Sequence, residues 1–212
     1  MQIDAIKKER LVIIILSILY VVGFFGSIMP AYKATFLSLS PITLCLSFIA
    51  IVLSIKPPKT PTFLFLIFAG VVGFIAEFVG VNTGLLFGSY RYLTNLGVKI
   101  AGVPLIISIN WAILTIGAAH FSMLISQNKR IRIALAAIFM LLFDIIMEPV
   151  AIKSQFWIWE GGDIPTYNYV CWFIIGFILQ FIYFSKIKDT PNKVFIALFT
   201  MMLLFFILLN LF

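Results

Sequence analysis

The sequence has very little charge for its length. Only 11% of its 212 residues are Asp, Glu, Lys or Arg, whereas 63% are hydrophobic. Soluble domains carry about 25% charged and about 45–50% apolar residues. One soluble core could not bury this much apolar surface, so the composition excludes a soluble domain and predicts a polytopic membrane protein.

Residues that build metal sites, disulfides and cofactor folds are also scarce. Cys45 and Cys171 are the two cysteines, far apart and without a Cys-x-x-Cys or Cys/His pair, which argues against a disulfide or a zinc site. No Gly-x-Gly-x-x-Gly follows a strand pattern, so no dinucleotide or flavin fold is visible. The single histidine, His120, falls near the inner end of its predicted helix, where we expect a structural role. We therefore expect no metal and no cofactor.

Long apolar runs fill most of the chain. A membrane-crossing helix needs about 20 apolar residues, and prolines at 30, 57, 58, 61 and 191 mark where such helices should stop or start. We predict an all-α integral membrane protein with a single transmembrane domain over residues 1–212. Its seven helices are expected at 11–29, 36–55, 62–81, 104–126, 131–151, 168–185 and 193–212.

The basic residues are distributed as a topology signal. A net charge of +7 would indicate a nucleic-acid partner only if the charges formed a patch. Instead, eleven of the fifteen Lys and Arg residues fall on one side of the predicted membrane, in alternate connections. Because cytoplasmic connections carry the basic excess, we predict a cytoplasmic N-terminus, an external C-terminus and a multi-pass location in the cell (inner, cytoplasmic) membrane. We predict that the protein contacts the lipid bilayer and binds no nucleic acid.

Three carboxylates, Glu77, Asp144 and Glu148, lie inside the predicted helices. An ionised group there costs about 2.5–3.5 kcal/mol and is a functional-site candidate. Counted along the helices, these residues and Asn110 lie within about 10 Å of the outer face. Asp144 and Glu148, spaced i and i+4, share a helix face, and two close carboxylates cannot both ionise cheaply, so one should keep a proton as a general acid requires. Helix capping or interhelical hydrogen bonding is the structural alternative.

All four tryptophans map to the same outer side: Trp111, Trp157, Trp159 and Trp172. An interfacial belt is one explanation, although a belt would also place tryptophan at the inner face. Indole rings beside an acid can also stabilise a cation by about 0.5–2 kcal/mol. Both explanations stay open.

Several motifs together resemble a known family. They are Glu77-Phe-Val-Gly-Val-Asn-Thr-Gly-Leu-Leu-Phe-Gly-Ser-Tyr-Arg-Tyr92, Asn110-Trp111, Asp144-x-x-x-Glu148-Pro149, Trp157-x-Trp159 and Asn168-x-x-x-Trp172. Residues 74–172 resemble the integral-membrane carotenoid-biosynthesis proteins, which include CruF-type carotenoid 1,2-hydratases and bisanhydrobacterioruberin hydratases. The resemblance implies cofactor-independent addition of water to the terminal double bond of an acyclic carotenoid held in the bilayer. It leaves association with other carotenoid enzymes open.

Hydration of an alkene requires an acid, a surround that stabilises a cation, and a base that delivers water. We assign Asp144 as proton donor, sharing its proton with Glu148, and Glu77 with Asn110 as the pair that orients water, although these roles could permute. The apolar faces of the third to sixth helices are expected to hold the polyene. Residues expected to bind the end group are Tyr90, Tyr92, Trp111, Trp157, Trp159, Asn168 and Trp172.

Other functions of multi-pass proteins with buried acids fit parts of the sequence. A retinal protein needs a lysine in the membrane interior, yet the last apolar run has only Lys193 at its cytoplasmic end. A transporter usually has polar residues along a continuous path, and the inner half here has little beyond His120. A carotenoid cyclase or isomerase would start with the same protonation. Transport and non-hydrating carotenoid chemistry therefore remain the alternatives.

Overall fold

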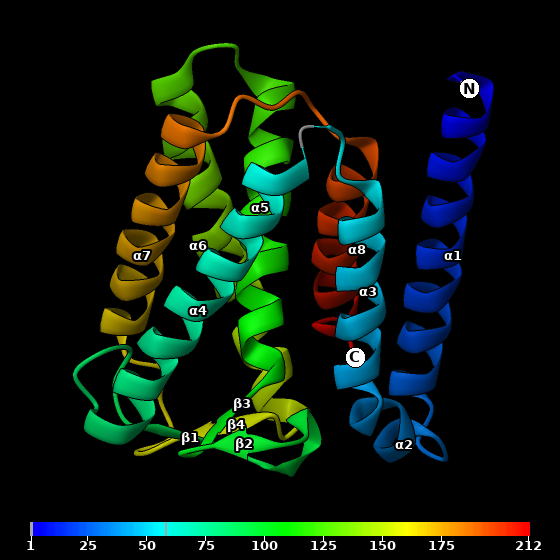
Figure 1. Ribbon diagram of the computed structural model, residues 1–212. Helices are drawn as coiled ribbons and strands as arrows, with labels where there is room; N and C mark the ends of the chain where they lie inside the picture. The colour runs from blue at the N-terminus through cyan, green and yellow to red at the C-terminus, as the bar shows by residue number, and fades with distance from the viewer. Residues whose placement is uncertain (1, 58) are drawn as a thin grey trace.

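The computed structural model describes residues 2–57 and 59–212 and is mainly α-helical (Figure 1). The helices are α1 (Gln2–Ile28), α2 (Lys33–Ser38), α3 (Ser40–Ser54), α4 (Lys59–Thr83), the 3-10 helix η1 (Thr94–Leu96), α5 (Ile106–Ile125), α6 (Lys129–Lys153), α7 (Thr166–Lys186) and α8 (Lys193–Leu209). Four short strands complete the fold: β1 (Tyr90–Tyr92), β2 (Lys99–Ile100), β3 (Val103–Pro104) and β4 (Trp157–Trp159).

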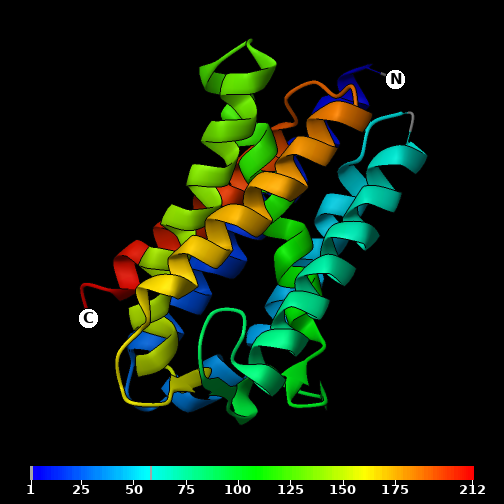
Figure 2. The same cartoon turned by 90° about the vertical axis from the view of Figure 1, so that its left-hand side faces the viewer.

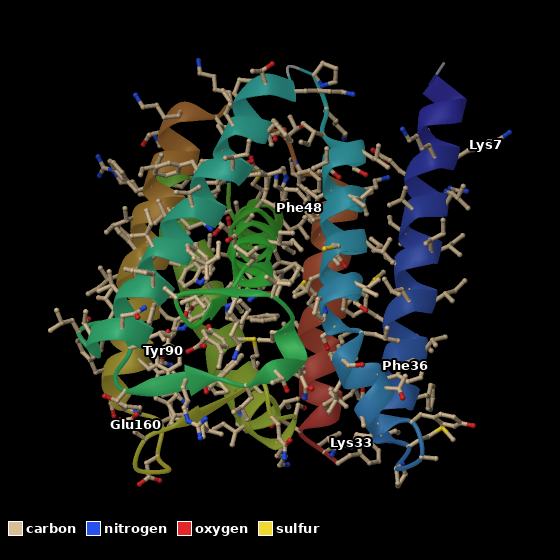
Figure 3. All side chains as sticks on the ribbon, turned by 60° about the horizontal axis from the view of Figure 1, so that its bottom comes forward. Lys7, Lys33, Phe36, Phe48, Tyr90 and Glu160 are labelled. Atoms are coloured by element: carbon tan, nitrogen blue, oxygen red, sulfur yellow. The ribbon has the colours of Figure 1, made fainter. Side chains whose placement is uncertain are left out.

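The long helices run side by side, and all four strands lie at one end of the bundle (Figures 1 and 2). The start of α1 lies at the opposite end, together with the connections α3–α4, α5–α6 and α7–α8. Figure 3 shows the same polarity, with Lys7 far from Tyr90 and Glu160. The bundle therefore has a strand end and an end that carries the short connections.

Five helices are long and apolar enough to cross a membrane, namely α1, α4, α5, α6 and α7. Two shorter apolar helices, α3 with 15 residues and α8 with 17, lie beside them. The outward surfaces of the long helices carry large apolar side chains, such as Ile18 on α1 and Leu64 on α4, which are more than half exposed. The protein is thus a multi-pass membrane protein.

The predicted helix over 36–55 is divided in the structure. Helix α2 ends at Ser38, Leu39 forms a turn, and α3 starts at Ser40 with Pro41 in its first turn. Proline has no N–H and cannot extend the hydrogen-bond ladder of a preceding helix, although it fits well at the first turn of a new one. The apolar run alone did not reveal this break.

Helix α5 is the centre of the bundle, packing against α3, α4, α6, α7 and α8. Most of its residues are buried. Because its partners surround it, polar groups on α5 face other helices and not lipid. This placement explains how α5 can carry Asn110 and His120.

His120 joins helix ends at the connection end of the bundle. It is fully buried, its Nε2 lies 2.9 Å from the Tyr183 hydroxyl, and its Nδ1 accepts the backbone N–H of Asn192 at 3.1 Å. The Asn192 amide donates in turn to the carbonyl oxygen of Ser54 at 2.7 Å. These bonds connect the ends of α3, α5, α7 and α8, which is a structural role.

Candidate active site

The two long connections at the strand end of the bundle pair with each other as a small antiparallel sheet. Tyr90 lies opposite Trp159 and Tyr92 opposite Trp157. Alternate side chains of a strand point to opposite faces, so these four aromatic residues are buried while Arg91 between the tyrosines is exposed. The sheet therefore directs two phenols and two indoles toward the ends of the helices beneath it.

Glu77, on α4, receives three hydrogen bonds. Its Oε2 accepts from the hydroxyls of Tyr90 and Tyr92, the latter at 2.7 Å, and its Oε1 accepts from Trp111 Nε1 at 3.1 Å. The Glu77 side chain is buried. Hydrogen bonds to a charged acceptor contribute about 1.5–3 kcal/mol each, so this environment suits a carboxylate.

The two tyrosines are held as proton donors. Burial, followed by the negative charge of Glu77, raises the pKa of Tyr90 far above its ordinary value. The same two causes, in the same order, raise the pKa of Tyr92 well above its usual range. Both phenols therefore keep their protons at any physiological pH and donate to Glu77.

Glu148 and Asp144, on α6, have separate sets of donors. Oε2 of Glu148 accepts from the indole nitrogens of Trp157 and Trp159, each at 3.0 Å. Oδ2 of Asp144 accepts from the Asn168 amide at 2.8 Å, whereas its Oδ1 is buried without a partner among the described residues. No direct hydrogen bond joins the two carboxyl groups within that part of the chain, and proton sharing between them stays a prediction. Each side chain turns instead toward its own donors.

These groups surround one small chamber of about 30 Å³. This volume has room for about one water molecule. Ten of the eleven residues predicted for the site line this chamber. The eleventh, Trp111, does not line it but donates a hydrogen bond to Glu77. The lining residues from the prediction are Glu77, Tyr90, Tyr92, Asn110, Asp144, Glu148, Trp157, Trp159, Asn168 and Trp172.

No three His, Cys, Asp or Glu side chains in residues 2–57 and 59–212 are grouped as they would be to hold a metal ion. The acids of the chamber are instead engaged by phenol, indole and amide groups. The chamber can hold a water molecule among three carboxyl groups, which accept three, two and one hydrogen bonds on Glu77, Glu148 and Asp144.

A stacked pair of indoles supports the chamber. Trp111 and Trp172 lie with ring centroids 4.1 Å apart and planes 11° apart. Trp111 is fully buried against Gly73 of α4, and a Cβ built on Gly73 would overlap the indole. The absence of a side chain at Gly73 therefore allows Trp111 to reach both Glu77 and Trp172.

Replacing Gly73 with alanine should displace Trp111, which donates a hydrogen bond to Glu77. Substrate turnover should then fall by about 100-fold, because a misplacement of about 1 Å in a site can have that effect. The near-ultraviolet circular dichroism of the stacked indoles should weaken in parallel. Gly176→Ala is the matched control, since its nearest neighbour would lie at 3.4 Å. Unchanged dichroism and turnover in Gly73→Ala would show that Trp111 does not depend on this glycine.

Two features of the site were missed from the sequence. Phe87 is almost fully buried, with its ring centroid 6.5 Å from Trp111 and 6.4 Å from Trp172, and it lines the chamber. The anchoring role of the tyrosines and loop tryptophans was also missed. Tyr-Arg-Tyr and Trp-Ile-Trp both alternate with period two, which is a strand signal that could have indicated a shared face.

The fold and this site together define a multi-pass α-helical membrane protein. At one end of its bundle, buried carboxyl groups accept hydrogen bonds from tyrosine and tryptophan side chains. The family model for carotenoid biosynthesis proteins matches residues 39–212. The chain belongs to this carotenoid biosynthesis protein family.

One curated relative is a bisanhydrobacterioruberin hydratase from Haloarcula japonica, 29% identical over 108 residues. The match covers 47% of this chain and 37% of the relative, so it spans well under half of that protein's length. No solved structure matches the chain.

Proposed function

We propose that this protein is a carotenoid hydratase that adds water across the terminal C=C bond of an acyclic carotenoid end group. Family membership and the similarity to a protein named as a hydratase support carotenoid modification. The observation that carries hydration in particular is the chamber, which has room for about one water molecule beside three carboxyl groups.

Asp144 is the proton donor in this proposal. Asp144 accepts one hydrogen bond, from Asn168, whereas Glu77 accepts three. The Oδ1 atom of Asp144 is buried without a partner within the described residues. An unpartnered oxygen is costly for a buried carboxylate but acceptable for a carboxylic acid whose O–H faces the reacting group. Asp144 would transfer its proton to the less substituted alkene carbon, where the π electron pair forms the new C–H bond.

The resulting tertiary cation would be captured by water. The water oxygen forms the C–O bond, and Glu77, with Asn110 orienting the water, accepts the proton released from it. The product is a tertiary alcohol, and the excess proton on Glu77 must return to Asp144 to complete the cycle. Glu148 lines the same chamber as both groups, so we assign it to this return through the chamber water.

Aromatic side chains at the chamber wall would stabilise the cation. Trp157 lines the chamber, and cation–π attraction to an indole contributes about 0.5–2 kcal/mol. Exclusion of bulk water by the sheet would strengthen this attraction. A cyclase or isomerase needs the same acid but no water, so the water-sized space beside the acids favours hydration over both.

We also propose seven membrane crossings, with α3 and α8 added to the five long helices, and the strand end outside the cell membrane. The connections rich in Lys and Arg gather at the end opposite the strands, as the positive-inside rule expects for the cytoplasmic side. The chamber would then lie near the outer interface, where water and lipid meet.

Expression in lycopene-accumulating cells tests the function. The pigment should gain the mass of one water molecule per reacted end, measured by mass spectrometry of the extracted carotenoids. Formation of a cyclic or isomerised product of unchanged mass would replace hydration by the cyclase or isomerase alternative. Proton uptake by proteoliposomes without any pigment change would support the transport alternative instead.

A further inference from the structure

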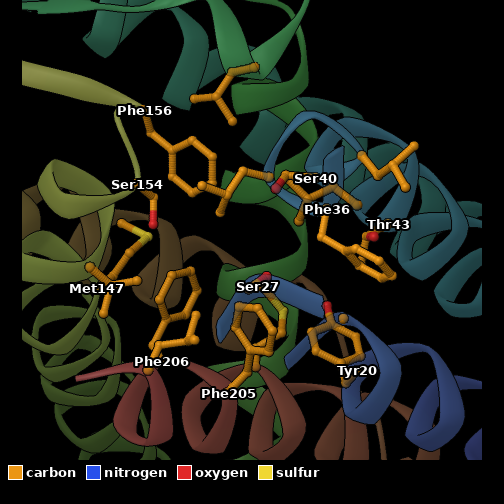
Figure 4. A pocket seen from close by; sticks show the side chains of 18 of the residues that line it. Tyr20, Ser27, Phe36, Ser40, Thr43, Met147, Ser154, Phe156, Phe205 and Phe206 are labelled. Atoms are coloured by element: carbon orange, nitrogen blue, oxygen red, sulfur yellow. The ribbon is translucent and has the colours of Figure 1, made fainter. Parts of the chain in front are cut away.

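A second, larger cavity adjoins the chamber. Its volume is about 210 Å³, against about 30 Å³ for the chamber. It is lined by α1, α2, α3 and α8, together with parts of α5 and α6 (Figure 4). Its walls are mostly aliphatic and aromatic, with Tyr20, Phe36, Phe205 and Phe206 among the aromatic groups.

The two cavities share a wall. Four residues line both of them: Ile107, Asn110, Met147 and Trp157. Ile107 and Met147 are apolar, whereas Asn110 and Trp157 carry polar groups. Met147 is unbranched, with three rotatable side-chain bonds, so it is the most adjustable part of this wall. The larger cavity therefore meets the carboxyl site at a boundary between apolar and polar surface.

The larger cavity also reaches the lipid-facing surface. Three of its lining residues are exposed, namely Val22 on α1, Leu39 between α2 and α3, and Ile42 on α3. These positions lie on the outside of a membrane protein, so an apolar molecule could pass from the bilayer into the cavity without crossing water.

We infer that this cavity binds the unsaturated end of the acyclic carotenoid, while the chamber holds the water. The substrate identity rests on the proposed function, whereas the cavity and its opening stand on geometry. An apolar cavity of about 150 Å³ can hold benzene, so about 210 Å³ accepts a terminal isoprenoid segment that the chamber is too small to take. The new C–O bond would then form at the shared wall.

This inference changes which helices face the polyene. The sequence predicted the third to sixth apolar helices, which correspond to α4–α7. Of these, only α5 and α6 line the cavity, and α1, α2, α3 and α8 supply most of the rest. The helices outside the carboxyl site thereby gain a role in admitting substrate.

Occupancy can be measured without turnover by thiol protection. Ser27 lies on α1 within the cavity lining and is 7% exposed (Figure 4). We would place Ser27→Cys in a Cys45→Ser background, because Cys45 is exposed while Cys171 is buried. In phospholipid nanodiscs, lycopene should slow the alkylation of this thiol by N-ethylmaleimide at least fivefold. The extent of alkylation over time is measured by peptide mass spectrometry.

Val21→Cys is the matched control, because Val21 lies on the same helix, is 53% exposed and does not line the cavity. Its alkylation rate should not respond to lycopene. Equal alkylation rates for Ser27→Cys with and without lycopene would overturn the inference. This holds also where both rates are slow because a lipid acyl chain fills the cavity.

A parallel turnover assay on the wild-type protein separates the two proposals. Hydrated product without thiol protection would leave the proposed function intact and remove the cavity assignment. Thiol protection without hydrated product would retain the cavity as a polyene site and remove the hydratase function. Ser27→Phe, which fills the cavity, should also lower lycopene hydration at least tenfold, whereas Val21→Phe should not.

Discussion

Replacing Asp144 with asparagine is expected to reduce carotenoid hydration by at least 100-fold. Asparagine keeps the size of the side chain but has no proton to transfer, and general acids contribute about 10²–10⁴-fold to rate. Because Asp144 is fully buried and bonded only to Asn168 within the described residues, its replacement removes no other interaction seen in the structure. The measurement is hydrated product per amount of folded protein in lycopene-accumulating cells.

Asp163→Asn is the control for Asp144→Asn. Asp163 lies in the loop after β4 and is exposed, so its loss should leave the yield unchanged. Binding of lycopene by Asp144→Asn, measured from the absorbance of pigment that purifies with the protein, should match the wild type. Wild-type yields from Asp144→Asn would show that another group supplies the proton.

Replacing Glu77 with glutamine is expected to cause a comparable loss, at least 100-fold, and also to destabilise the protein. Glu77 accepts from Tyr90, Tyr92 and Trp111. A glutamine must turn its NH₂ group toward one of these donors, which leaves a buried donor unpaired at a cost of about 1–3 kcal/mol. Turnover and melting temperature in detergent would measure the two effects separately.

Glu160→Gln serves as the control for Glu77→Gln, since Glu160 is exposed beside the same sheet. The double variant Tyr90→Phe with Tyr92→Phe keeps the carboxyl group of Glu77 but removes two of its donors. If Glu77 is the base, this double variant should retain more turnover than Glu77→Gln. Equal turnover in wild type and Glu77→Gln would rule out a role for Glu77 in the reaction.

The layer of polar groups at the strand end was predictable because helix geometry is regular. A fixed rise per residue converts sequence position into depth, so Glu77, Asn110, Asp144 and Glu148 could be placed together before any contact was known. The structure brings all four to one chamber. The hydrogen-bond donors of Asp144 and Glu148 could not be predicted in this way, because Asn168, Trp157 and Trp159 come from other segments of the chain.

The pairing of the aromatic residues, in contrast, could not be predicted from the sequence. Tyr90 and Trp159 are separated by 69 positions in the chain, yet they are paired across β1 and β4. Nothing local in either segment specifies that partner. Their expected role was to line a pocket for the end group, and only the pairing revealed that their hydroxyl and indole groups hold Glu77 and Glu148.

The sequence by itself determined the membrane class, the apolar segments and the scarcity of charge inside them, because hydrophobicity and helix periodicity are properties of short stretches. Tertiary structure alone decided which donor serves each carboxyl group, how small the chamber is, and where a larger apolar cavity meets it. Those features depend on contacts between segments distant in the chain, and their energies come from burial and hydrogen bonding that exist only after the helices have packed.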